Sequence, residues 1–145
     1  MKQKSVREFK KTITNADIFV SNKIKKIHPV VEIISKNLSE IELIKFIRIK
    51  PDFIQASSEV TEGRIKTPIT KPDHPTAVGL SLIIDFAYNN VQFYEINSAV
   101  KGYGRKMVDA VFKSLPNNWS AVVVMDWSDG FWDKMQKSYK NLEIM

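Results

Sequence analysis

A chain of 145 residues that is 43% hydrophobic and 26% charged has the composition of one globular domain and is long enough to bury a core. It contains no cysteine, which excludes disulfides and thiol nucleophiles and favours a cytoplasmic location. The charged amino terminus is followed by no long apolar run, so we expect neither a signal peptide nor a membrane span.

The net charge of +6 comes from one region. Residues 1–26 hold eight Lys and Arg against two acids, which leaves the rest of the chain neutral. Ser5 can cap a helix that runs to about Lys11, and a second helix is predicted from Asn15 to Ile27, so residues 1–38 would form a basic helical segment. Residues 1–26 could bind nucleic acid by neutralising phosphates, or could be an ordinary solvated face.

The next part of the chain is less regular. A helix is predicted from Pro29 to Asn37. The serine and glutamate of Ser39–Glu42 match a capping box and predict a further helix as far as Pro51, although the β-branched content leaves a strand from Ile44 to Ile49 open. Phe53 to Val60 can form a strand. Residues 61–76 contain too many prolines for regular structure and form either a lid over an acceptor or a plain surface loop.

A hairpin is predicted next. Val78 to Ala87 reads as a strand, and Tyr88-Asn89-Asn90 as the tight turn into a second strand that begins at Val91. In that second strand, alternation places Val91, Phe93 and Glu95 on one side and Gln92, Tyr94 and Ile96 on the other.

The second strand leads into the stretch around which the chain is organised. After it come Lys101-Gly102-Tyr103-Gly104 and an amphipathic helix to Leu115. Glycines allow a sharp turn, and the free amides and dipole at a helix start attract phosphate. Lys101, Arg105 and Lys106 add positive charge there. The alternative is a strand-to-helix connection with no ligand.

Three more elements follow: a buried strand over Trp119–Asp126, a helix that starts at Phe131 and ends near Tyr139, and a terminal strand from Leu142. The order of elements, the turn Lys101–Gly104 and the segment Phe131-Trp132-Asp133-Lys134-Met135 resemble the cofactor-binding half of the GNAT acyl-CoA N-acyltransferase superfamily. The resemblance covers about residues 78–145.

This resemblance implies a single α/β domain with a mixed, mostly antiparallel central sheet flanked by helices. It also implies an N-acetyltransferase that moves the acetyl group of acetyl-CoA directly to an amine acceptor of unknown class. In the family, the turn holds the pyrophosphate, and backbone amides at the end of the preceding strand polarise the thioester carbonyl. The corresponding residues here are Ile96, Asn97, Ser98, Lys101, Gly102, Tyr103, Gly104, Arg105 and Lys106.

Two residues are candidates for proton transfer. Glu95 is the only acid on its strand and could serve as a general base through a water molecule, or could instead pair with a surface lysine. Tyr139 is the nearest phenol after the last helix and is the candidate acid. The two histidines precede prolines and have no carboxylate cluster nearby, so we expect no metal.

The alternative function is a non-catalytic interaction protein that binds nucleic acid or a protein partner through the basic amino-terminal arm. Under either function, the edge of the terminal strand could pair with a second copy in a homodimer.

Overall fold

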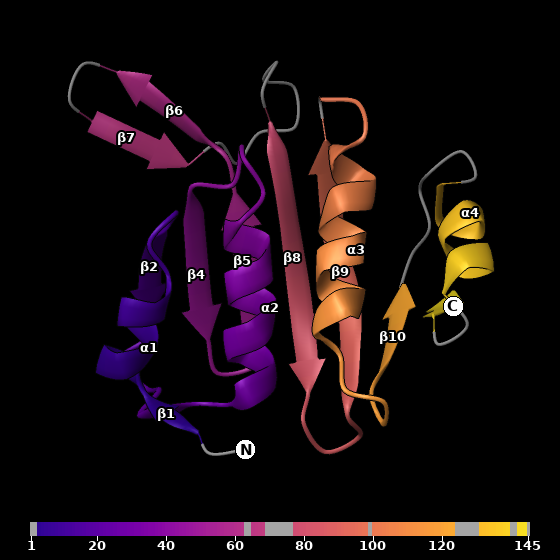
Figure 1. The fold of residues 1–145 in the computed structure, drawn as a ribbon, viewed down its shortest axis with the longest axis horizontal. Helices are drawn as coiled ribbons and strands as arrows, with labels where there is room; N and C mark the ends of the chain where they lie inside the picture. Colours follow the sequence, from indigo (N-terminus) through magenta and orange to yellow (C-terminus); the bar gives the residue numbers. More distant parts are fainter. Residues whose placement is uncertain are drawn as a thin grey trace.

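A mixed sheet is the centre of the computed structural model, which describes residues 3–62, 65–68, 77–98, 100–123, 131–139 and 142–144. Seven strands in this part of the chain form the sheet in the order β11-β10-β9-β8-β5-β4-β2 (Figure 1). Their bounds are Asp17–Val20 for β2, Phe46–Lys50 for β4, Phe53–Ser57 for β5, Val78–Asp85 for β8, Asn90–Ser98 for β9, Ser120–Val123 for β10 and Leu142–Ile144 for β11.

The sheet is antiparallel in its centre and parallel toward both edges. Strands β4, β5, β8 and β9 pair antiparallel in succession. At one edge β2 runs parallel to β4, and at the other β10 runs parallel to β9 and β11 to β10. Two small sheets lie outside it: β1 (Lys4–Ser5) with β3 (Lys26–Ile27), and β6 (Glu59–Glu62) with β7 (Ile65–Pro68). The predicted mixed α/β class is confirmed.

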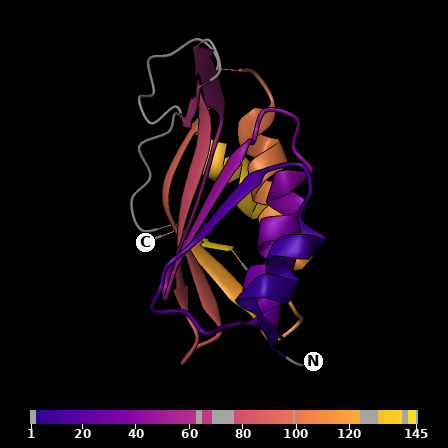
Figure 2. The same ribbon diagram turned by 90° about the vertical axis from the view of Figure 1, so that its left-hand side faces the viewer.

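The helices gather on one face of this sheet (Figure 2). They are α1 (Val6–Thr12), α2 (Pro29–Ser39), α3 (Tyr103–Ser114) and α4 (Phe131–Ser138). Helices α2 and α3 are joined by a hydrogen bond of 2.8 Å in which the Asn37 side-chain amide donates to Ser114 Oγ. None of the helices in the described ranges is long and apolar enough to cross a membrane.

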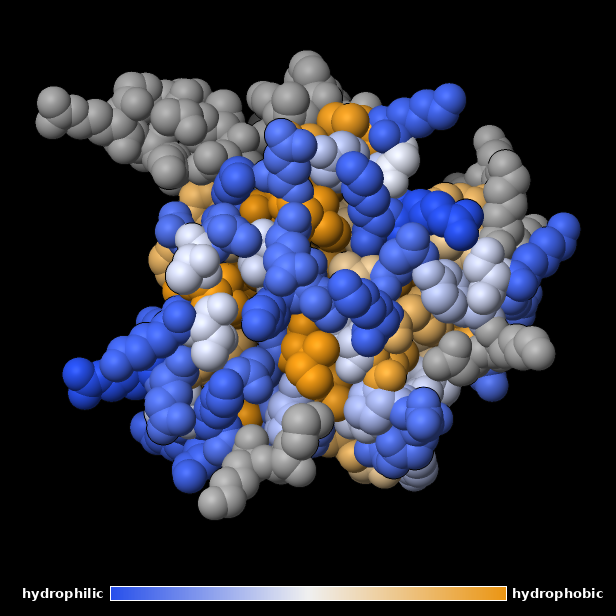
Figure 3. Space-filling model, in the orientation of Figure 1, coloured by the Kyte–Doolittle hydropathy of each residue, from blue (hydrophilic) through white to orange (hydrophobic). Residues whose placement is uncertain are grey.

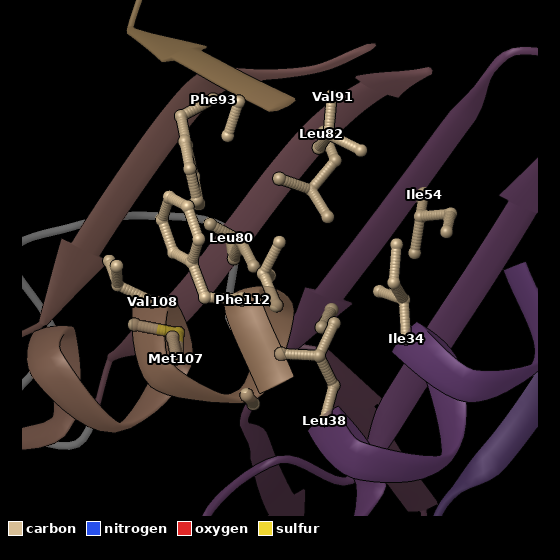
Figure 4. Packing of buried hydrophobic residues seen from close by; sticks show 14 of the residues in the cluster. Ile34, Leu38, Ile54, Leu80, Leu82, Val91, Phe93, Met107, Val108 and Phe112 are labelled. Atoms are coloured by element: carbon tan, nitrogen blue, oxygen red, sulfur yellow. The ribbon is translucent and has the colours of Figure 1, made fainter. Parts of the chain in front are cut away.

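The core lies between α2, α3 and the sheet. On β8, Leu80 and Leu82 face the helices and are buried, as strand alternation requires. Figure 4 shows Leu38 of α2 and Phe112 of α3 beside Leu80, and Ile34 of α2 pointing toward Ile54 of β5. Removing this apolar surface from water is the main favourable term in folding.

The outer side of the helices is solvated. Figure 3 shows hydrophilic side chains over most of this face, with hydrophobic surface only in small areas between them. Each helix therefore has one apolar side toward the sheet and one polar side, as the periodicity of α3 predicts.

The basic amino-terminal segment is only partly helical. The predicted helix capped by Ser5 is confirmed as α1, in which the Glu8 amide donates to Ser5 Oγ at 3.2 Å. The predicted helix from Asn15 to Ile27 is wrong, because this region contains β2 and β3. Ile18 lies opposite Ile47 in the parallel β2–β4 pair. Pairing with the edge of the sheet, which the sequence alone does not reveal, outweighs the helical spacing.

The prediction of a helix beginning near Glu40 is also wrong. Helix α2 is confirmed where it was predicted but continues to Ser39, whose hydroxyl donates to the Lys36 carbonyl oxygen at 2.6 Å rather than capping a new helix. The alternative strand is the correct one, since β4 begins at Phe46.

The remaining elements follow the sequence closely. The β8–β9 hairpin, α3, α4 and β11 lie where they were predicted, and β10 lies within the predicted strand Trp119–Asp126, of which residues 124–126 are outside the described residues. Over residues 61–76 the prediction of irregular structure is wrong at the β6–β7 hairpin, while residues 63–64 and 69–76 of the predicted loop lie outside the described residues.

We expect the substitution Ile34→Ala to lower the free energy of unfolding by about 2–5 kcal/mol, since it empties a fully buried site between α2 and the sheet. Urea denaturation followed by circular dichroism would measure it. Lys36→Ala, on the exposed side of the same helix, is the matched control and should change the value by less than about 0.5 kcal/mol. Equal losses in both variants would contradict this packing.

Candidate active site

A β-bulge interrupts β9 shortly before the glycine turn. Ser81 lies opposite Glu95, but its neighbour Leu82 lies opposite Phe93, so Tyr94 has no partner on β8. A bulge adds one residue to one strand and reverses the side on which later residues point. The sequence prediction that Glu95 shares a side with Phe93 is therefore wrong. Glu95 lies with Ser81 on the face of the sheet away from the helices, which we call the open face.

Beyond the bulge, β9 continues past the described part of β10. The two strands pair in parallel from Asn90 opposite Ser120 to Phe93 opposite Val123. Figure 1 shows β10 diverging from β9 toward the end at which β9 meets the turn. Within the described residues, Glu95 to Ser98 pair with β8 but have no partner on the β10 side.

The turn after β9 is open on the side of Gly102. Gly102 has φ 87°, a left-handed conformation that glycine adopts without strain, and a Cβ built there would meet nothing within 4 Å. Helix α3 starts with no side-chain cap and no acid in its first turn. The amides of Gly104 and Arg105, in that first turn, have no preceding helical carbonyl to bind.

Three cations surround this turn. Lys101, Arg105 and Lys106 are all exposed. Arg105 Nε lies 3.7 Å from Asp109 Oδ2, a solvated pair that contributes little to stability. Cations at a helix start oppose the helix dipole, so an anion bound there would relieve an unfavourable arrangement.

The other two residues of the turn pack inward. The Tyr103 side chain is buried, with Lys106 Nζ 4.4 Å from its ring centroid, and its amide donates to the Val100 carbonyl oxygen at 3.3 Å. A Cβ on Gly104 would lie 3.3 Å from the Phe131 ring of α4, so Phe131 closes that side of the turn.

Glu95 lines a small cavity of about 20 Å³ on the open face of the sheet, with room for roughly one water molecule. Its other walls come from β5, β8 and β9: Gln55, Ala56, Ser57, Gly79, Leu80, Ser81 and Asn97. The Ser57 hydroxyl is buried there and has no hydrogen-bond partner among the described residues. A water molecule in this cavity would satisfy Ser57 and contact the carboxylate of Glu95.

The rest of the predicted strand segment divides between the two faces. Ile96 lies opposite the buried Leu80 and packs against the core, whereas Asn97 lies opposite Gly79 and lines the cavity. Ser98 is exposed, and its hydroxyl donates to the Val100 carbonyl oxygen. Only the main chain of Ile96 is therefore available to a ligand.

Tyr139 lies apart from this group. Its ring stacks on Phe112 with centroids 4.1 Å apart, and its hydroxyl donates to Asp109 on α3. Burial and then the hydrogen bond to Asp109 raise the pKa of Tyr139 from 10.0 to about 12. Asp109 is seven residues along α3 from Gly102, or about 10 Å. Tyr139 therefore holds the end of α4 against α3. This structural role is an alternative to the predicted role of Tyr139 as the acid.

The open face also carries a row of side chains that the sequence did not reveal. Phe19, Arg48, Gln55, Ser81 and Glu95 lie opposite one another on five successive strands. The Arg48 guanidinium donates to Gln55 Oε1 at 3.1 Å, which orients this amide beside the cavity. Only the register of strands far apart in the sequence brings these residues together.

Comparisons with family models, curated proteins and solved structures found no match to this chain. In the described part of the chain, no group of three His, Asp or Glu side chains could hold a metal ion.

We expect Tyr139→Phe to lose stability relative to the natural protein below pH 10, because a partly buried hydrogen bond is removed. The folded-state pKa of Tyr139 is raised, so the advantage of the natural protein should be constant below pH 10 and should shrink as pH rises toward 12. Urea denaturation of both proteins from pH 8 to 12 measures this difference. Both proteins contain the same lysines, so the effect of lysine titration on stability cancels when the two free energies of unfolding are subtracted. A difference that stays constant to pH 12 would contradict the assigned contact.

Proposed function

We propose that the protein is an acetyl-CoA-dependent N-acetyltransferase of the GNAT type. The observation that carries the proposal is one unit of structure: a bulged strand β9, an open glycine turn, the uncapped helix α3, and β10 returning parallel to β9. This arrangement is suited to a diphosphate at the turn and to an extended chain beside the end of β9, which has no partner among the described residues of β10.

The turn fits the diphosphate of coenzyme A. Free amides in the first turn of α3, the open space at Gly102 and the nearby cations Lys101 and Arg105 suit two linked phosphates. The pantetheine chain, which carries amide groups, would extend from there along β9 and use main-chain groups of Ile96, Asn97 and Ser98 in the manner of an added strand.

Transfer requires a neutral amine, a polarised carbonyl and a proton for the departing thiolate. A water in the Glu95 cavity would carry the ammonium proton to the carboxylate, and the amine nitrogen would then attack the thioester carbonyl carbon. Main-chain amides beyond the bulge would stabilise the oxyanion. The C–S bond breaks as the amide forms, and the thiolate takes a proton from solvent.

Acetyl-CoA should raise the melting temperature, since any ligand of the folded state stabilises it. At about 100 times Kd the gain of about 2.7 kcal/mol corresponds to roughly 5–15 °C for a chain of this size. The double variant Lys101→Gln and Arg105→Gln should lose more than half of the shift because the phosphates lose two charged partners. Differential scanning fluorimetry measures both.

The matched control is Lys113→Gln with Lys137→Gln, which removes two exposed charges from the last turns of α3 and α4. It should retain the full shift. No shift of the natural protein at millimolar acetyl-CoA would overturn the proposal.

Glu95→Gln should lower kcat about 10²- to 10⁴-fold while the acetyl-CoA shift stays unchanged, since a general base acts on the acceptor and not on the cofactor. A thiol reagent can follow release of free coenzyme A with a panel of polyamines, lysine peptides and amino-terminal peptides. The protein contains no cysteine, so it contributes no background. Unchanged kcat in the variant would show that Glu95 is not the general base.

A further inference from the structure

A hollow of about 370 Å³ lies at the opposite end of β9 from the glycine turn. It is bounded by the loop before α2, the first turns of α2, the end of β4 and Phe86 in the turn before β9. Ile27, Val31 and Ile49 are buried and form an apolar floor. At about 3.3 Å per residue, the length of β9 separates this hollow from the glycine turn by roughly 26 Å.

One wall of the hollow is held by side-chain packing. The Val30 amide donates to His28 Nδ1 at 3.1 Å, so the remaining ring nitrogen Nε2 of His28 carries its proton. The His28 ring lies 4.9 Å from the ring of Phe86 and 6.0 Å from that of Trp119. These contacts shape the wall in advance of any ligand.

Lysines surround the opening. Lys23, Lys25 and Lys26 line it and are exposed, and no acid is among the described residues that line it. The Lys23 amide donates to Ser21 Oγ at 3.3 Å, which helps to fix the loop.

These three lysines have no ion-pair partner in the described part of the chain. By contrast, Nζ of the nearby Lys4 lies 2.6 Å from Oε2 of Glu32 and forms an ion pair with it. Lys50 also borders the hollow, but its Nζ lies 5.8 Å from the ring centroid of Phe53, its partner on β5. Phe53 lies on the face of the sheet away from the helices, so the Lys50 ammonium points away from the hollow. Like charges gathered at one opening repel one another, and a bound anion would relieve that repulsion.

We propose that this hollow binds a small organic anion with an apolar body. The lysines would hold its carboxylate, sulfonate or phosphate group, and its hydrocarbon part would cover Ile27, Val31 and Phe86. The volume is within the range of small-molecule sites, which combine an apolar lining with a few polar groups. This binding is independent of the proposed acetyl transfer because the two sites lie at opposite ends of the sheet.

A concave apolar floor favours a small amphipathic anion over nucleic acid. Binding of single strands uses exposed aromatic faces for stacking. Here Phe86 is half-buried and packs against His28 and Trp119, with the Phe86 and Trp119 rings near perpendicular at 82°. The hollow therefore has charge for an anion and apolar area for a tail, without a free stacking platform.

The test is fluorescence titration of the full chain with the anionic probe anilinonaphthalene sulfonate, followed by displacement with decanoate. Lys25→Gln with Lys26→Gln should weaken probe binding about tenfold, because two charge-assisted contacts are lost. Lys10→Gln with Lys11→Gln removes the same charge from exposed positions on α1, outside the hollow, and should change binding less than about twofold. Circular dichroism confirms that each variant is folded.

Decanoate should displace the probe at far lower concentration than decanol or inorganic phosphate, since the site needs both the charge and the tail. Equal weakening by the two double variants would overturn the proposal, as would displacement by decanol or phosphate at the same concentration as decanoate. Stronger displacement by a single-stranded oligonucleotide would overturn it in favour of a nucleic-acid surface. The acetyl-CoA shift should be unchanged in Lys25→Gln with Lys26→Gln, which separates this outcome from that of the transferase proposal.

Discussion

Burial of one face of the sheet under α2 and α3 is the constraint on which the rest of the structure depends. Leu80 and Leu82 of β8 meet Leu38 of α2 and Phe112 of α3 at this layer, and all are buried. Because strand side chains alternate, the same constraint places polar residues such as Ser81 on the other face. The helical layer thus also determines which side chains reach the open face.

The bulge at Tyr94 shifts this alternation along β9. One extra residue keeps Phe93 in the core and moves Glu95 to the open face beside Ser81. It lies where β9 stops pairing with the described part of β10. A single local irregularity therefore places a carboxylate beside a water-sized cavity. It also precedes a stretch of β9 that has no partner among the described residues of β10, and the proposed transfer chemistry would use both features.

The two proposed sites would bind anions in different ways. At the glycine turn, main-chain amides of α3 would be the principal donors, with exposed cations around them. At the other end, the first turn of α2 is already capped by His28, and side-chain charge from lysines surrounds an apolar floor. The first arrangement suits a compact diphosphate, and the second suits an anion with a hydrocarbon body.

The sequence by itself determined those elements whose signals are local. The glycines and helical period of 102–114, the turn at Asn89, the Ser5 cap and the start of α2 at Pro29 all depend on residues within a few positions of one another. Tertiary structure alone decided that residues 17–20 join the sheet edge, that Ser39 ends a helix, and that Glu95 changes face. The cavity around Glu95 likewise needs Gln55 and Ser57 from a distant strand. Such contacts depend on strand register, and register is set by burying a shared face rather than by any single segment.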